Sequence, residues 1–170
     1  MHRVRQSGSQ LALLILALLG IADAFYLTLA HYDDQVTLAC PNTGFVNCAP
    51  VLTSKYSYVP GTELPISLPG MAWCLAVAGL ALLGIFLGTE RRWLRLAEFF
   101  WTLLGMFTIL YLVYVEIVLV HNLCLWCTVL HALILLMFLI ALVQLPRRPL
   151  EDDVEEEEVE EQPIIPSEKF

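Results

Sequence analysis

The chain has 170 residues, of which 58% are hydrophobic and 15% charged, and its mean hydropathy is +0.71. This composition excludes an ordinary soluble domain and indicates an integral protein of a lipid bilayer. The net charge of −8 arises at the C-terminal end, where ten of the 17 acidic residues lie between Glu151 and Glu168, and the rest of the chain has no basic stripe that would indicate a nucleic acid partner.

Four apolar stretches are each long enough to cross a hydrocarbon core, which needs about 20 helical residues. They run from Leu11 to Ala30, from Leu68 to Leu87, from Leu96 to Val120 and from Leu123 to Leu145. The sequence therefore predicts an all-α integral membrane protein, built as a four-transmembrane-helix bundle.

The first stretch could instead be a secretory signal. Arg3 and Arg5 precede its apolar core, and residues 22–24 (Ala-Asp-Ala) resemble a cleavage site. We favour a retained span, because the apolar run continues through residues 25–27.

The basic residues predict the orientation. Of the basic residues, Lys55 alone lies in the long loop between the first two spans. The seven arginines all fall on the opposite side: Arg3, Arg5, Arg91, Arg92, Arg95, Arg147 and Arg148. The positive-inside rule then places both termini in the cytoplasm and the long loop on the periplasmic or lumenal side. That side is oxidising, so disulfides persist there.

We expect three parts in the chain: a cytoplasmic N-terminus over residues 1–9, a membrane domain over 10–146, and an acidic, disordered cytoplasmic tail over 147–170. The outer loop of the membrane domain covers about residues 31–67. Turn-forming residues lie at 40–44 and 59–61, and between them Cys48 to Tyr56 reads as a short amphipathic helix that could lie on the bundle like a lid.

Two cysteine pairs fall on the outer side. Cys124 and Cys127 are three residues apart at the start of the fourth span, so their sulfurs lie on adjacent turns of one helix face, where the helix N-terminus favours a thiolate. They could form a redox centre, a metal site or a buried pair. Cys40 and Cys48 form a second candidate pair, for which a purely structural disulfide is the alternative. These spacings do not match the usual zinc sites, so we expect no metal.

These residues resemble the vitamin K epoxide reductase family. The resemblance rests on the order of a C-x7-C loop pair (Cys40, Cys48), Ser54, Gly70, and the Cys124-Leu125-Trp126-Cys127 motif on four spans, and it covers about residues 10–145. The quinone-reducing partner of bacterial disulfide formation also has two pairs, but in the reverse order. The chain thus looks like a bacterial-type member without a fused thioredoxin-like domain.

The resemblance implies roles for the four cysteines. The position of Cys127 faces a quinone, that of Cys124 exchanges disulfides with Cys48, and that of Cys40 meets the external thiol partner. Electrons would run from the partner through Cys40 and Cys48 to Cys124 and Cys127, and then to the quinone. Such a relay is chemically reasonable, because exchange passes through mixed disulfides and needs a mobile carrier.

Other positions are candidates for quinone contact. The family often has a polar residue before the second span and a tyrosine four residues after the C-x-x-C, and these positions hold Ile66 and His131. His131 keeps a hydrogen-bond donor and Ile66 does not. Ser54 matches a family position near the active centre, and Trp126 could either stack on a ligand or anchor the helix at the interface.

Three further polar or sulfur-bearing side chains lie within the spans. Asp23 and Glu116 lie toward the outer ends, where ionisable groups are often functional. They could pass protons to the quinol, although for Glu116 we favour contact with interfacial water. Cys74 matches neither pair, and we expect it to be a small buried core residue.

We therefore predict a membrane thiol–quinone oxidoreductase that supports disulfide formation in exported proteins. Its partners would be a thioredoxin-fold thiol carrier, separate from this chain, and a quinone of the menaquinone, ubiquinone or phylloquinone type, and its location a bacterial inner membrane. One alternative is a vitamin K epoxide or quinone reductase that runs in the reductive sense. Another is a non-catalytic membrane protein with structural disulfides.

Overall fold

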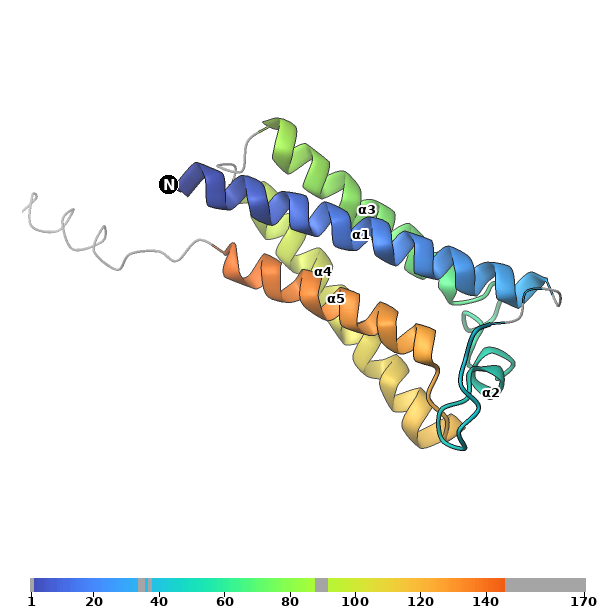
Figure 1. The fold of residues 1–170 in the computed structure, drawn as a ribbon. Helices are drawn as coiled ribbons and strands as arrows, with labels where there is room; N and C mark the ends of the chain where they lie inside the picture. The colour runs from blue at the N-terminus through green and yellow to red at the C-terminus, as the bar shows by residue number, and fades with distance from the viewer. Residues whose placement is uncertain (1, 34–35, 37, 88–91, 146–170) are drawn as a thin grey trace, which may run out of the picture.

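The computed structural model describes residues 2–33, 36, 38–87 and 92–145. The helices follow in the order α1 (His2–Tyr32), α2 (Cys48–Leu52), α3 (Ser67–Leu87), α4 (Arg92–Tyr114), the π-helix η1 (Val115–Val120) and α5 (Leu125–Val143) (Figure 1). The loop around Arg91 and the acidic tail expected over residues 147–170 lie outside the described residues.

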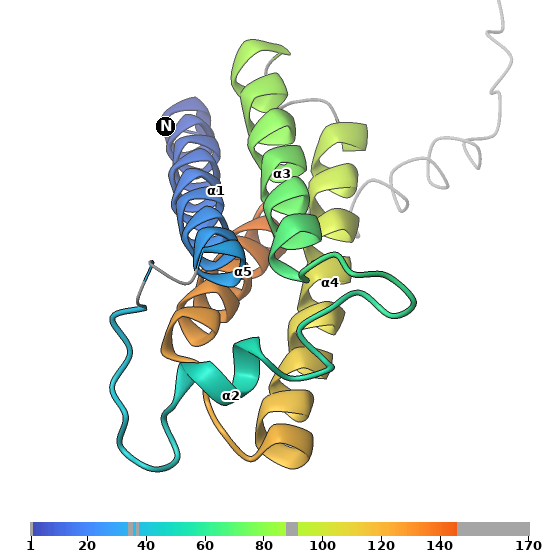
Figure 2. The same ribbon diagram turned by 90° about the vertical axis from the view of Figure 1, so that its right-hand side faces the viewer.

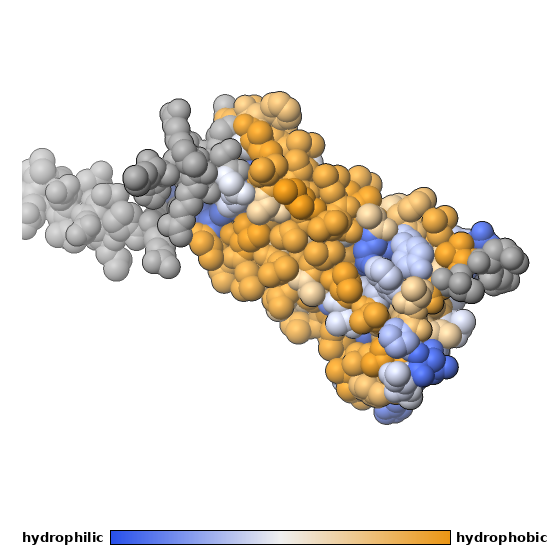
Figure 3. All heavy atoms as spheres, viewed as in Figure 1, coloured by the Kyte–Doolittle hydropathy of each residue, from blue (hydrophilic) through white to orange (hydrophobic). Residues whose placement is uncertain are grey.

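Four helical segments are long and apolar enough to cross a membrane, which confirms the predicted fold class. They are Gly8–Tyr32, Ser67–Leu87, Arg92–Val120 and Leu125–Val143. In Figure 3 hydrophobic residues cover most of the visible helical surface, and hydrophilic residues gather at the end that carries the loop. An apolar surface of this kind is suited to contact with lipid, where every backbone polar group must be paired within the helices.

Glycines allow the helices to approach closely. A Cβ atom at Gly20 of α1 would lie 2.8 Å from the Cys74 Sγ atom of α3, and a Cβ atom at Gly105 of α4 would overlap the Trp73 indole. Trp73 and Trp101 each donate an indole N–H to the other's backbone carbonyl at 3.3 Å, which ties α3 to α4. Small residues and hydrogen bonds are the means by which helices associate in a bilayer, because apolar burial drives little there.

A buried polar cluster joins three helices at the end where α1 begins. The Gln10 side-chain amide donates to the Glu98 carboxylate at 3.0 Å and to the Gln144 carbonyl oxygen at 2.9 Å. Gln10 and Glu98 are buried, and Gln144 is partly buried. These bonds fix the relative positions of α1, α4 and the residue that follows α5.

The opposite end of the bundle, here called the loop end, carries residues 38–66, which include α2. Figure 2 shows α2 lying across this end, near the start of α5 and the end of α4. The predicted short helix is present but stops at Leu52 instead of Tyr56. Just after its end, the Ser54 hydroxyl bonds to the Val51 carbonyl, a side-chain bond of the kind that competes with continued helix.

Candidate functional site

A single parallel bridge joins the loop to the start of the fourth span. The Asn47 N–H donates to the Leu123 carbonyl at 3.0 Å, and the Leu123 N–H donates to the Phe45 carbonyl at 2.9 Å. The fourth span was predicted to begin at Leu123, but α5 begins at Leu125, because Leu123 is used in this bridge and Cys124 serves as the N-cap. The bridged residues are Val46 and Leu123, so Cys124 directly follows one partner and Cys48 lies two residues after the other.

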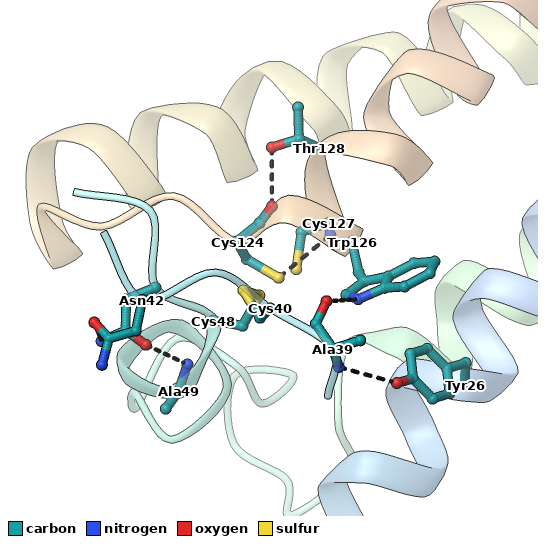
Figure 4. The surroundings of a disulfide bond; sticks show 11 residues. Tyr26, Ala39, Cys40, Asn42, Cys48, Ala49, Cys124, Trp126, Cys127 and Thr128 are labelled. Atoms are coloured by element: carbon teal, nitrogen blue, oxygen red, sulfur yellow. Dashed lines mark hydrogen bonds between the residues drawn. A yellow bond between two sulfur atoms is a disulfide. The ribbon is translucent and has the colours of Figure 1, made fainter. Parts of the chain in front are cut away.

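The two cysteine pairs lie together at the loop end. Cys40 and Cys48 form a disulfide, and Cys124 and Cys127 are thiols. Cys48 and Cys124 are 1% and 0% exposed and belong to one buried cluster with Leu27, against which Cys40 and Cys127 also pack. Figure 4 shows the loop disulfide facing the sulfur of Cys124. All four cysteines singled out from the sequence are thus in one site.

The position of Cys124 favours a thiolate. Its Sγ atom accepts a hydrogen bond from the Cys127 backbone N–H at 3.3 Å, as a helix N-cap does. The hydrogen bond from the Cys127 thiol, helped by backbone N–H groups, holds the pKa of Cys124 below its usual value despite burial and the nearby Glu116 carboxyl. A thiolate is the reactive form in disulfide exchange, so the geometry makes Cys124 a competent nucleophile.

A cavity of about 320 Å³ opens beside this cluster, between the loop and helices α1, α3, α4, η1 and α5. Its walls are mostly apolar, and Cys127, Ser54, Ile66 and His131 all line it. Its size is at the lower end of the range of small-molecule sites, which are mainly hydrophobic with a few polar groups. Cys127 is the cysteine of the second pair that lines this cavity, whereas Cys124 faces the loop disulfide.

The polar residues expected near a ligand are placed differently from one another. His131 lines the cavity at 8% exposure, one helical turn deeper than Cys127. Ser54 also lines it, but its hydroxyl donates to the Val51 carbonyl at 2.9 Å. His131 is therefore better placed than Ser54 to offer a polar group to a bound molecule.

Trp126 faces the loop and is not among the described residues that line the cavity. Its indole N–H donates to the Ala39 carbonyl at 3.2 Å, and the Ala39 N–H donates to the Tyr26 hydroxyl at 3.3 Å. The rings of Tyr26 and Trp126 meet edge to face, with their centroids 5.0 Å apart. Trp126 thus holds the residue next to Cys40, and these contacts do not support the stacking on a ligand that its sequence position allowed.

Glu116 is the site residue for which the sequence interpretation was wrong. We expected its carboxyl group to reach interfacial water, but it is 4% exposed and lines the cavity. The carboxyl interacts with the Cys124 backbone N–H and the Cys127 thiol. The one signal in the sequence was an acidic residue inside an apolar span, and the linear pattern could not show which way it faced.

Asp23 and Cys74 lie outside the cavity lining, in the core between α1 and α3. Cys74 is fully buried and packs at Gly20, which confirms its expected role as a small core residue. Asp23 is also buried, and neither of its carboxyl oxygens has a hydrogen-bond partner in the described structure.

Comparison with known proteins adds one finding to this geometry. The family model described as "Vitamin K epoxide reductase family" matches residues 11–142, a range that includes all five cysteines. A comparison with curated protein sequences gave no match.

Proposed function

Because the chain belongs to the vitamin K epoxide reductase family, whose members are membrane oxidoreductases linked to quinones, we propose that it oxidises the thiols of a thioredoxin-fold partner and reduces a quinone. In this role it supports disulfide formation in exported proteins. Cys40, Cys48, Cys124 and Cys127 are the proposed redox residues, and the membrane domain over residues 10–146 carries them all.

One observation carries the proposal. The Cys40–Cys48 disulfide packs on Cys124, while Cys127 lines an apolar cavity on the other side of the same helix start. A dithiol that lies between the loop disulfide and an apolar cavity can exchange with the disulfide and deliver electrons to a molecule bound in the cavity.

The thiol chemistry proceeds by exchange. A partner dithiol reduces the Cys40–Cys48 disulfide and becomes oxidised itself. The Cys48 thiolate then attacks the Sγ atom of Cys124 in a Cys124–Cys127 disulfide, and Cys127 leaves as a thiolate. Attack by Cys40 on the mixed disulfide restores the loop disulfide and leaves Cys124 and Cys127 reduced. Oxidation of this inner dithiol closes the cycle.

The cavity supports a quinone as the acceptor. Its apolar walls suit a quinone ring, and His131 offers a polar group within them. A bound quinone would supply the two-electron oxidant for the Cys124–Cys127 pair. Ile66 lines the cavity without a side-chain donor, which favours simple quinone reduction over the epoxide chemistry of the alternative function.

We further propose that the loop end faces the periplasm. All four redox cysteines lie there, opposite the end where α1 begins, whereas Arg92 and Arg95 lie at the start of α4, away from the loop end (Figure 1). Under the positive-inside rule the arginine end is cytoplasmic. Labelling Lys55 and an engineered cysteine near the start of α1 with membrane-impermeant reagents in spheroplasts tests this.

The function is tested with purified protein in detergent, a small dithiol, and added ubiquinone or menaquinone. We expect quinone absorbance to fall with turnover, Cys127→Ala to abolish it, and Cys74→Ala, which removes a thiol remote from the cavity, to leave it near the wild-type rate. If the wild-type protein is inactive with every quinone, or Cys127→Ala turns over normally, the proposed function is wrong.

A further inference from the structure

Glu116 is a buried acid in the wall of the cavity. Among the described residues that line this cavity, Glu116 is the one carboxylic acid. The other titratable side chains in the lining are Cys127, His131, His31 and Tyr56. An ionisable side chain at membrane depth is costly, so its presence there calls for a functional reason.

The π-helix η1 holds Glu116 against the start of α5. The N–H groups of His121 and Asn122 both donate to the Glu116 carbonyl, the second at 3.1 Å. His121 has a left-handed backbone (φ 55°), which ends the π-helix and turns the chain toward Cys124. Wide turns of this type are frequent at functional sites, because they redirect a side chain that a regular helix would point elsewhere.

The two sides of the Glu116 carboxyl group differ. The group interacts with the Cys124 N–H and the Cys127 thiol, but its Oε2 atom is buried and has no hydrogen-bond partner among the residues that the structure describes. One carboxyl group therefore contacts the thiol of the cavity-facing cysteine and keeps an oxygen available for a proton. By comparison, His131 lies a turn deeper, and Asp23 acts on Cys127 through charge without lining the cavity.

We propose that Glu116 is the proton-transfer residue of the inner pair: it accepts the Cys127 proton as that thiol is oxidised and passes it into the cavity. The inference rests on the proposed function. When the Cys127 S–H bond breaks and the Cys124–Cys127 bond forms, one electron pair goes to the quinone acceptor. The quinol needs two protons. One proton comes from Cys127 through Glu116. The other is taken up from water, and it balances the proton that Cys124 released to water when it became a thiolate.

The first test compares turnover in two matched variants. Glu116→Gln keeps the shape of the side chain and an acceptor for the Cys124 N–H but cannot carry a proton. We expect it to lower quinone turnover by about 10²- to 10⁴-fold, the range typical of a lost general acid–base group. The control is Glu98→Gln, which alters another buried acid of the same span, hydrogen-bonded to Gln10 and remote from the cavity. It should turn over within a few-fold of wild type.

The second test needs no quinone and so separates this inference from the proposed function. In a Cys40→Ala/Cys48→Ala background, the reduced inner pair is closed with diamide and trapped with an alkylating reagent over time. Closure requires Cys127 to lose its proton, so Glu116→Gln should slow it, and Glu116→Asp should recover part of the lost rate. Thermal unfolding in detergent identifies any variant that fails to fold.

The rate at which the Cys124–Cys127 disulfide closes in the Glu116 variants decides whether Glu116 transfers a proton. Slower closure in Glu116→Gln, with a faster Glu116→Asp, supports proton transfer even if no quinone is ever reduced. Closure as fast as in the parent or faster overturns the inference, because Glu116 would then act through its negative charge or through ligand binding. The inference also fails if Glu116→Asp closes no faster than Glu116→Gln.

Discussion

Cys48 and Cys124 lie side by side because a parallel bridge between Val46 and Leu123 pairs the segments that precede them. In this bridge the Asn47 N–H donates to the Leu123 carbonyl at 3.0 Å. The approach of the loop disulfide to the inner pair is therefore fixed by backbone hydrogen bonds. In a paired segment a shift of one residue reverses the direction of every side chain, so this register decides which sulfurs can meet.

The register gives a first prediction for Asn47. Its side-chain oxygen accepts from the Ala49 N–H at 3.2 Å and caps α2, the helix that begins with Cys48. Asn47→Ala should cost about 1 kcal/mol of local stability and let Cys48 move away from Cys124. We expect slower turnover with a thioredoxin-fold partner and unchanged turnover with a small dithiol that reduces the inner pair directly.

The control for this experiment is Asn42→Ala, which removes only the 3.4 Å bond between the two asparagine side chains. It should leave both rates near wild type, and Asn47→Ser, which retains a capping oxygen, should recover partner-dependent turnover. Equal losses with both reductants in Asn47→Ala would mean that the cap supports the inner pair itself.

The order of the relay gives a second prediction. Cys40→Ala should abolish electron transfer from the thioredoxin-fold partner but spare turnover with a small dithiol, because Cys124 and Cys127 remain intact. Oxygen-free assays with both reductants, followed by quinone absorbance, measure this difference. Loss of both activities would contradict the order in which the loop pair precedes the inner pair.

The environment of Cys124 gives a third prediction, about pH. Because hydrogen bonds lower its pKa, the thiolate should persist as pH falls to values at which a free cysteine is already protonated. In reduced protein its ultraviolet thiolate absorbance, taken as the difference from Cys124→Ala, should have a midpoint below that of free cysteine. Cys127→Ala removes the largest cause and should raise the midpoint, whereas Cys127→Ser, which keeps a donor, should raise it less.

The contact between Trp126 and the loop gives a fourth prediction. Trp126→Phe keeps an aromatic ring beside Tyr26 but loses the 3.2 Å bond to the Ala39 carbonyl. The lost bond should cost about 0.5–1.5 kcal/mol and speed hydrogen exchange around residues 38–40, with KM for the quinone unchanged. A raised KM with unchanged exchange would place Trp126 in ligand binding instead.

Helix packing gives a fifth prediction. Gly105→Ala places a methyl group into the Trp73 indole, so α3 and α4 must separate or the indole must leave its rotamer. The overpacking should destabilise the protein by about 1–3 kcal/mol and lower its Tm in detergent. Gly79→Ala, at an exposed helical site with no atom near the new methyl group, should leave Tm unchanged or raise it slightly. A Tm for Gly105→Ala equal to that of wild type would contradict this packing.

The sequence by itself determined the fold class and the approximate helix positions. Continuous apolar runs of membrane length can be satisfied only as helices in a bilayer, so four spans follow from hydropathy alone. The cysteine order and spacing also pointed to the family whose model matches residues 11–142. Such features are local, or concern only order along the chain, and so can be read without coordinates.

The tertiary structure decided how the site is built. Side-chain direction within an all-apolar span depends on the neighbouring helices, so the sequence could not show that Glu116 lines the cavity beside Cys127. Nor could it show that Trp126 holds the loop at Ala39, since that bond joins segments 87 residues apart. The bridge that brings Cys48 to Cys124 is likewise a long-range pairing. Contacts of this kind arise only when distant segments pack together.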